Sequence, residues 1–160
     1  MKSQAQKHRK DSAKNTYASY YVGLKILLRR GDSYLFVYTP EGYPDIPGGR
    51  IDATEHTTQL LTVLKRELRE ELGTSVRYEI GKPIFHFRRH FSNPEKHIFL
   101  VVFEAKYISG EINLSKEHAR YEWLNPKKDS LPPAALFHKE GATALKNYFK
   151  ETRKTKPSKR

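Results

Sequence analysis

Short apolar runs separated by turn-forming residues occupy most of the chain. Five of them are rich in β-branched and aromatic residues, which favours strands over residues 17–28, 34–38, 84–91, 97–107 and 121–124. Arg30-Gly31-Asp32 separates the first two runs, and Ser92-Asn93-Pro94-Glu95 separates the next two. Both connections are short and contain turn residues, so each of these pairs of runs is predicted to form a hairpin.

Two other segments have helical periodicity. Over residues 57–72 the leucines recur on one face, and Gly73 follows at the position where helices commonly end. A second helix is predicted over residues 134–149, after Leu131-Pro132-Pro133. Residues 40–49 are dense in Pro and Gly and predict a loop of fixed shape. The order of strands, helix, strands and helix favours an α/β fold with a mixed sheet covered by helices.

The net charge of +12 on 160 residues lies mostly at the two ends. Residues 1–16 carry five basic side chains and one acidic, and residues 150–160 carry six and one. Because neither end has apolar residues to bury, we predict two disordered basic tails around one folded domain of residues 17–149. The tails either aid solubility or hold a nucleic acid such as RNA.

Other function classes are excluded by composition. The chain has no cysteine, so disulfides, thiolate zinc sites and thiol nucleophiles are absent. The longest apolar run, residues 98–103, is far shorter than the ~18 residues of a membrane span. The start of the chain has no hydrophobic signal core, so we expect a soluble cytoplasmic protein.

Three carboxylates on the first predicted helix indicate metal chemistry. Glu67, Glu70 and Glu71 fall within an arc of about 100° beside the leucine stripe. Glu67 and Glu71 are a like-charge pair four residues apart, which destabilises a helix unless a cation offsets the repulsion. Mg²⁺ takes oxygen ligands and is commonly held by carboxylates together with substrate phosphates. Arg66 can pair with Glu70 or orient a neighbouring carboxylate.

The sequence around these carboxylates resembles the signature of the Nudix hydrolases. That signature is a Gly, five residues, a Glu, seven residues, and then Arg-Glu-apolar-x-Glu-Glu-x-Gly. Here Gly49 and Glu55 have the matching spacing, and the second half reads Arg66-Glu67-Leu68-Arg69-Glu70-Glu71-Leu72-Gly73. Ten residues, not seven, separate Glu55 from Arg66, and Thr74 stands where an apolar residue usually follows. Three extra residues are almost one helical turn, so we expect the carboxylates to keep their relative orientation.

The resemblance extends over residues 20–149 and implies a fold and an activity. The fold is an α/β/α sandwich around a mixed sheet, and the activity is hydrolysis of a diphosphate linkage in a nucleoside diphosphate joined to another group. It implies that Glu67, Glu70 and Glu71 bind Mg²⁺ or Mn²⁺, with a contribution from the Gly48 carbonyl. It further implies that Arg66 orients Glu67 and that Glu67 or Glu117 is the general base.

The substrate is less defined by the sequence. We predict contacts to it from Arg50, Phe87, Arg88 and Arg89, since the last three lie among aromatic and basic residues on one strand. Small substrates are a nucleoside triphosphate, a nucleotide sugar or a dinucleoside polyphosphate. The alternatives are the 5′ end of RNA, held through the basic tails, and a catalytically silent domain that binds nucleotides. Many relatives form dimers, so a homodimer is an option that no feature of the sequence establishes.

Overall fold

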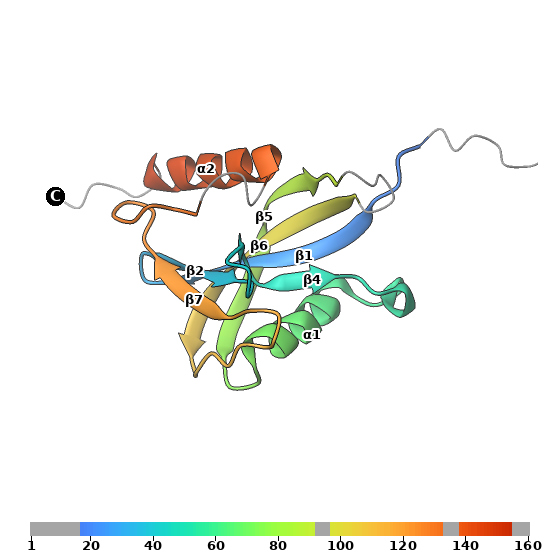
Figure 1. Ribbon diagram of the computed structural model, residues 1–160, viewed down its shortest axis with the longest axis horizontal. Coiled ribbons are helices and arrows are strands. Elements are labelled where there is room, and N and C mark those ends of the chain that lie inside the picture. The colour runs from blue at the N-terminus through green and yellow to red at the C-terminus, as the bar shows by residue number, and fades with distance from the viewer. Residues whose placement is uncertain (1–16, 92–96, 133–137, 155–160) are drawn as a thin grey trace, which may run out of the picture.

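The computed structural model describes residues 17–91, 97–132 and 138–154, and within them it contains one seven-stranded sheet and two α-helices (Figure 1). A short 3₁₀ helix, Ala53–Glu55, precedes the first α-helix. In chain order the elements are β1 (Tyr21–Arg30), β2 (Ser33–Tyr38), β3 (Pro44–Asp45), β4 (Gly48–Arg50), α1 (Leu60–Leu72), β5 (Arg77–Arg89), β6 (Ile98–Ser109), β7 (Arg120–Leu124) and α2 (His138–Lys154).

The sheet is mixed, as the order of elements predicts. Its main strand order is β3-β2-β1-β6-β5, with β4 paired to β1 and β7 paired to β2. Strands β1 and β6 run parallel, and the other pairs are antiparallel. The predicted α/β class and the predicted β1–β2 and β5–β6 hairpins are therefore confirmed, while the connecting residues 92–96 lie outside the described residues.

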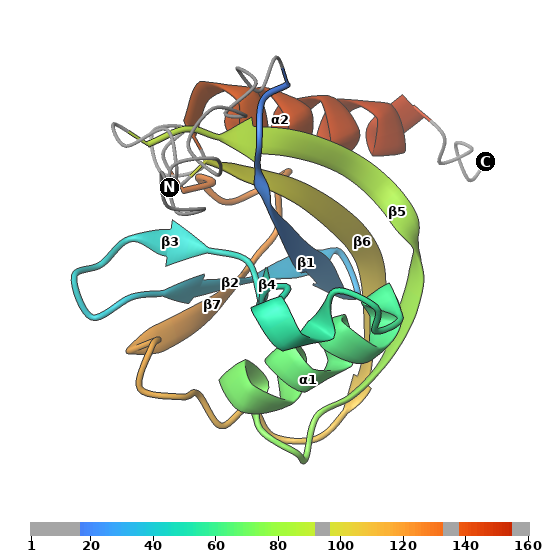
Figure 2. The ribbon, with the colours of Figure 1, turned by 90° about the vertical axis from the view of Figure 1, so that its right-hand side faces the viewer.

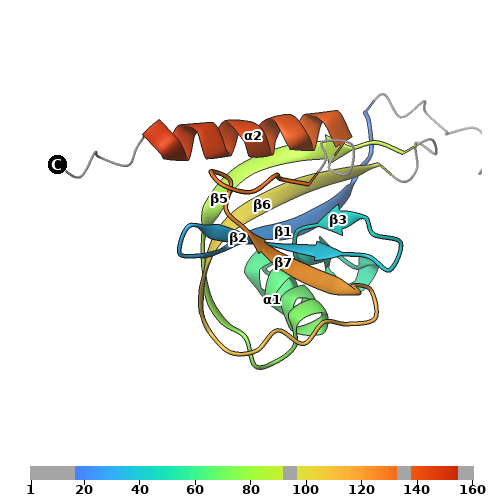
Figure 3. The same cartoon turned by 60° about the vertical axis from the view of Figure 1, so that its left-hand side comes forward.

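Strand β1 lies at the centre of two hydrophobic cores. Six consecutive residues of β1, Gly23–Leu28, are buried, which is typical of a strand covered on both faces. Leu24, Ile26 and Leu28 contribute to the core that contains the leucines of α1, and Leu27 contributes to the core that contains Leu145 and Phe149 of α2. Figures 2 and 3 show α1 and α2 on opposite sides of the sheet, which confirms the α/β/α sandwich.

The sheet forks along β1, and this fork positions the loop that follows β2. Strand β2 pairs with β1 only at its start, through Arg29 opposite Tyr34 and Arg30 opposite Ser33. Farther back along β1, Gly23, Leu24 and Lys25 pair with β4 instead. The chain between β3 and β4 therefore enters the fork and brings the two glycines of β4 against α1.

Several boundaries differ from the predicted ones. Strand β1 starts at Tyr21, and α1 starts at Leu60, because residues 53–58 form the 3₁₀ helix and a turn in which the Thr58 N–H donates to the Glu55 carbonyl. Strand β5 begins at Arg77, and its register shifts against β6 interrupt the alternation expected of a strand. Helix α2 continues to Lys154, so residues 150–154 are helical and the predicted boundary at 150 is wrong.

No helix in the described part of the chain is long and apolar enough to cross a membrane. The predicted tail 1–16, residues 134–137 of the predicted second helix and residues 155–160 lie outside the described residues.

Candidate active site

Helix α1 presents its carboxylates beside the face that it buries. Val63, Leu64, Leu68 and Leu72 are fully buried against the sheet, which fixes the rotation of the helix about its axis. Gly73, with φ of 86°, ends the helix, and its N–H donates to the Arg69 carbonyl. With the apolar stripe held in this way, the carboxylates of the helix lie at its boundary with β4.

The Glu71 carboxylate is buried against the backbone of β4. Glu71 is 5% exposed, and its Oε2 accepts a hydrogen bond of 2.8 Å from the Gly48 N–H. Burial raises the pKa of the Glu71 carboxyl to about 7, although Lys25 and the Gly48 N–H oppose the shift. Gly48 has φ of +123°, and a Cβ there would lie 2.2 Å from the Leu24 carbonyl oxygen. This position therefore requires glycine.

The neighbouring Gly49 lies directly against Glu67. A Cβ on Gly49 would lie 2.1 Å from Oε2 of Glu67, so the absence of a side chain makes room for this carboxylate. Burial also raises the pKa of the Glu67 carboxyl, and the hydrogen bond from Arg66 lowers it in part. The two glycines thus admit two carboxylates that are largely shielded from water, and of these Glu67 is paired with Arg66.

Arg66 holds three carboxylates at once. Its Nε and one terminal nitrogen donate to the two oxygens of Glu55 at 2.6 and 2.8 Å. The same terminal nitrogen donates to Oε1 of Glu67 at 2.8 Å, and the other donates to Glu70 at 3.1 Å. The two-oxygen contact shows that the three additional residues between Glu55 and Arg66 do not separate this pair. Arg66 is thus the hydrogen-bond partner of Glu70, which is the most exposed of the three motif carboxylates.

The loop before β7 is tied to the end of α1 and places Glu117 near Glu71. The Asn113 N–H donates to the Leu72 carbonyl at 2.9 Å, and the Ser115 N–H donates to the Glu71 carbonyl at 3.2 Å. Glu117 itself is exposed, and its negative charge is among the influences that raise the pKa of Glu71. The structure thus brings Glu117 to the cluster of Glu67, Glu71 and Gly48.

A second polar group, which the sequence did not reveal, lies in the fork of the sheet. Lys25 is 8% exposed, and its Nζ donates to Asp45 at 2.9 Å. Burial opposes the charge of Lys25, but Asp45 and Glu71 outweigh it and raise the pKa of the ammonium. His118 is 8% exposed and adjoins this pair; burial and Lys25 lower its pKa. The only sequence signal was a lysine inside the apolar run of β1.

The predicted substrate contacts have four different environments. Phe87 is 3% exposed in the core beneath α2, so the prediction that its ring contacts a substrate is wrong. Arg88 pairs with Glu140 of α2 at 3.2 Å, and Arg89 lies 5.4 Å from the Phe91 ring centroid. Arg50 directly follows Gly49 and is exposed. Of the four, Arg50 alone adjoins the motif in the chain.

The carboxylate oxygens of Glu67 and Glu71 are ligands of the kind that a divalent cation such as Mg²⁺ prefers. Glu67 and Glu71 offer hard oxygen ligands, and burial raises the pKa of both carboxyls, so a bound cation would favour their charged forms. Among the described residues no three acidic or histidine side chains already converge in a metal-binding arrangement. Glu70 faces Arg66, so it would have to leave that partner to join a shared ion.

Comparison with protein-family models identifies a NUDIX domain over residues 22–145. The chain belongs to the Nudix family. This Nudix domain includes the whole motif and every strand of the sheet, so the chain is a pyrophosphohydrolase of that family. A comparison with curated protein sequences gives no match.

Solved structures of Nudix proteins share the fold at low identity. The MutT protein from Methanosarcina mazei Go1 has a TM-score of 0.67 at 23% identity, over 84% of this chain and 96% of that one. An ADP-ribose pyrophosphatase from Streptococcus suis 89-1591 has a TM-score of 0.64 at 20% identity, over 86% and 96%. A UDP-X diphosphatase has a TM-score of 0.63 at 17% identity, over 89% and 68%. These likenesses establish the fold of this Nudix chain.

The raised pKa of Glu71 predicts a pH-dependent gain in stability for Glu71→Gln in chelator. Between pH 4.5 and about 7 the unfolded chain releases the Glu71 proton while the folded chain retains it. This group therefore lowers wild-type stability through that window and by a constant amount above it. We expect the glutamine variant to be as stable as wild type at pH 4.5 and more stable by about 2–3 kcal/mol at pH 8. Urea unfolding across this range measures the difference, and a difference independent of pH would contradict the assignment.

Alanine substitution is expected to lower stability strongly at one glycine of β4 and only slightly at the other. Gly48→Ala adds a Cβ 2.2 Å from a backbone oxygen at positive φ, so we expect a loss of about 2 kcal/mol or more. Gly49→Ala meets only the movable end of Glu67, so we expect stability within about 1 kcal/mol of wild type and a displaced carboxylate. Each variant is the control for the other in thermal unfolding, and equal losses would refute the distinction.

Proposed function

We propose that the protein hydrolyses a diphosphate linkage in a nucleoside diphosphate joined to another group, in a reaction that depends on Mg²⁺ or Mn²⁺. The observation that carries this proposal is the packing of Glu67 and Glu71 against the side-chain-free backbone of Gly48 and Gly49. It supports a site in which carboxylates, the backbone of β4 and a phosphate chain approach one another closely.

Each motif residue has a distinct role in this proposal. Glu67, Glu70, Glu71 and the Gly48 carbonyl would hold the cation, which, when bound, neutralises phosphate charge and lowers the pKa of the attacking water. Arg66 keeps one oxygen of Glu67 fixed through its 2.8 Å hydrogen bond. Arg66 also donates a hydrogen bond to Glu70, which lies one helical turn from Glu67. Glu70 would have to give up this hydrogen bond to bind the same cation.

Glu67 is the general base in this scheme. Burial raises its pKa, which makes it a stronger base near neutral pH than an exposed carboxylate. Arg66 holds Oε1, and Oε2 lies against the backbone of Gly49, so the orientation of this carboxylate is fixed on both sides. Glu117 is the alternative base, because its exposed carboxylate makes no hydrogen bond or ion pair within the described residues.

The substrate class rests on the family and on the charge around the motif. Solved structures with this fold include an ADP-ribose pyrophosphatase and a UDP-X diphosphatase. Each of these names denotes a substrate in which a nucleoside diphosphate is joined to another group. Arg50 adjoins the motif and is exposed, so it is placed to meet substrate phosphate. We therefore place nucleotide sugars and ADP-ribose first among the small substrates.

Substitution of the motif carboxylates tests the activity. We expect Mg²⁺- or Mn²⁺-dependent cleavage of the diphosphate linkage in a panel of nucleoside triphosphates, nucleotide sugars, ADP-ribose and dinucleoside polyphosphates, and none in chelator. Chromatography of the products measures it, because cleavage yields a nucleotide together with pyrophosphate, a sugar phosphate or a second nucleotide. Glu67→Gln should lower kcat by about 10²–10⁴, and Glu117→Gln by less. Glu111→Gln, an exposed glutamate on the same loop, is the matched control. Equal turnover by wild type and Glu67→Gln would sink the mechanism, and nucleotide binding without turnover would indicate a silent domain.

The basic ends favour a second candidate, the 5′ end of RNA. Nine of the twelve net positive charges lie in residues 1–16 and 150–160. Because α2 continues to Lys154, the deletions that spare the fold are residues 1–16 and 155–160. If RNA is the substrate, the truncated chain should lose turnover of 5′-triphosphate RNA and part of its salt dependence, and keep turnover of small nucleotides. Unchanged RNA turnover by the truncated chain would exclude a role of the basic ends in binding RNA and would favour a small nucleotide as the substrate.

A further inference from the structure

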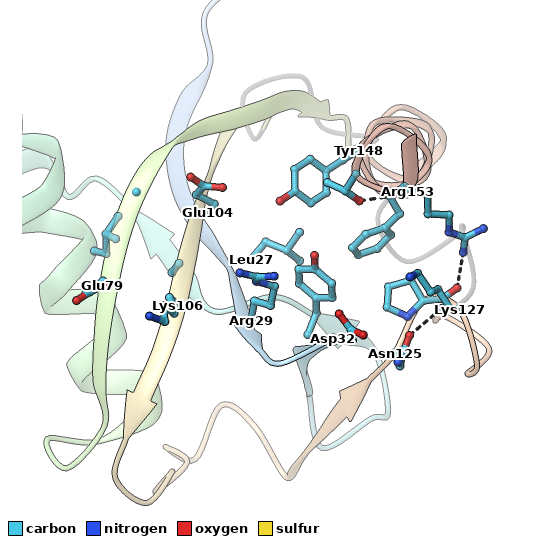
Figure 4. Close-up of a pocket in the computed structure, with 17 residues that line it drawn as sticks. Leu27, Arg29, Asp32, Glu79, Glu104, Lys106, Asn125, Lys127, Tyr148 and Arg153 are labelled. Atoms are coloured by element: carbon cyan, nitrogen blue, oxygen red, sulfur yellow. Dashed lines mark hydrogen bonds between the residues drawn. The ribbon is translucent and has the colours of Figure 1, made fainter. Parts of the chain in front are cut away.

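A cavity of about 530 Å³ lies between the C-terminal half of α2 and the sheet (Figure 4). Its walls come from the end of β1, the start of β2, the middle of β5 and β6, the segment after β7, and α2. None of the motif residues lines it. The cavity and the motif lie at different positions along β1. Leu27 and Arg29 line the cavity, whereas Gly23, Leu24 and Lys25 pair with β4, which carries the motif glycine.

The curvature of the sheet explains why this space exists. Strands β5 and β6 bend around α1, while α2 runs straight above them (Figure 2). The register shifts between Ile80 and Phe85 mark the bend, and Gly81 lies within it. A Cβ on Gly81 would lie 2.7 Å from Cγ of Glu104, so the glycine lets the Glu104 side chain lie across the strand. A straight helix cannot follow this surface, which opens the cavity at its C-terminal end.

Aromatic rings form much of the interior. Tyr34, Tyr148 and Phe149 line the cavity together with Leu27 and Ile80. Figure 4 shows the Tyr148 hydroxyl directed toward Glu104 across the space. Burial raises the pKa of Tyr148 to about 12, so its hydroxyl remains protonated at neutral pH. The cavity therefore offers aromatic surfaces beside two tyrosine side chains that interact with each other, a combination suited to a flat heterocycle.

The charged groups of the cavity differ between its two ends. At the sheet end, the half-buried Glu104 carboxylate makes no hydrogen bond or ion pair with the described residues. At the helix end, Arg153 and Lys127 lie together, because a terminal nitrogen of Arg153 donates to the Pro126 carbonyl at 2.6 Å. Arg29 lies between the ends (Figure 4). Asp32, Glu79 and Lys106 also line the cavity, so charged side chains of both signs surround it. A ligand that fits places N–H donors beside Glu104 and negative charge beside Arg153 and Lys127.

We propose that this cavity binds a mononucleotide, with its base beside Glu104 and its phosphate beside Arg153 and Lys127. The volume lies within the range of about 300–1,000 Å³ that is usual for small-molecule sites. Two adjacent N–H donors, as on the Watson–Crick edge of guanine, pair with both oxygens of a carboxylate, so guanine is the preferred base. The site is separate from the motif, and the proposal does not depend on the hydrolytic function.

Calorimetric titration in chelator with GMP, AMP and guanosine tests the two ends separately. We expect GMP to bind more tightly than AMP. Glu104→Gln should weaken GMP about tenfold or more and abolish the preference over AMP. The double substitution Arg153→Gln and Lys127→Gln should weaken GMP and leave guanosine unchanged. The matched controls are Glu111→Gln and, on the exposed face of α2, Lys146→Gln, neither of which lines the cavity.

Methyl NMR locates the bound nucleotide without relying on a variant. GMP should shift the methyl resonances of Leu27 and Ile80, which line the cavity. It should leave those of Leu64 and Leu68, on the buried face of α1, unchanged. The reverse pattern would place the nucleotide at the motif and overturn the proposal. Absence of GMP binding at millimolar concentration, or equal binding by wild type and Glu104→Gln, would also overturn it. Hydrolysis by wild type and Glu104→Gln, measured separately with Mg²⁺, tests the proposed function on its own.

Discussion

The hydrogen bond from the Gly48 N–H to the Glu71 carboxylate joins the sheet to helix α1 at the point on which the site depends. The missing side chain of Gly48 lets β4 pair closely with β1, and that of Gly49 leaves space for the Glu67 carboxylate beside this bond. This close packing excludes water from Glu71 and raises its pKa to about 7. Burial therefore disfavours the charged form of Glu71, and a divalent cation at this position would offset that cost.

Two basic side chains control the charge around that bond. Arg66 is bound to Glu55, Glu67 and Glu70, and it keeps the exposed side of α1 in one arrangement. On the other side Lys25 is bound to Asp45 and acts on Glu71 from a distance. Neither cation neutralises Glu71 by direct contact. The position left between them is the one that we assign to metal and phosphate.

Forking and bending of a single sheet produce both regions considered above. Where β2 departs from β1, the β3–β4 segment fills the gap and carries the glycines to α1. Where β5 and β6 bend away beneath α2, the opposite face opens into a cavity. Because β1 is buried on both faces, the two regions are held in a fixed relation while their ligands remain separated by the sheet.

Features that depend on local spacing could be predicted from the amino-acid sequence. The leucine stripe of residues 57–72 and Gly73 predicted a helix with three carboxylates on one arc, and the alternation of strands and helices predicted a mixed sheet. Contacts between distant segments could not be predicted in this way, because they depend on how the chain folds. The tertiary structure buried Phe87, paired Arg88 with Glu140, returned Glu55 to Arg66 and set Lys25 beside Asp45. Periodicity fixes which face a side chain occupies along its own element, whereas its partners depend on how the sheet forks, bends and packs.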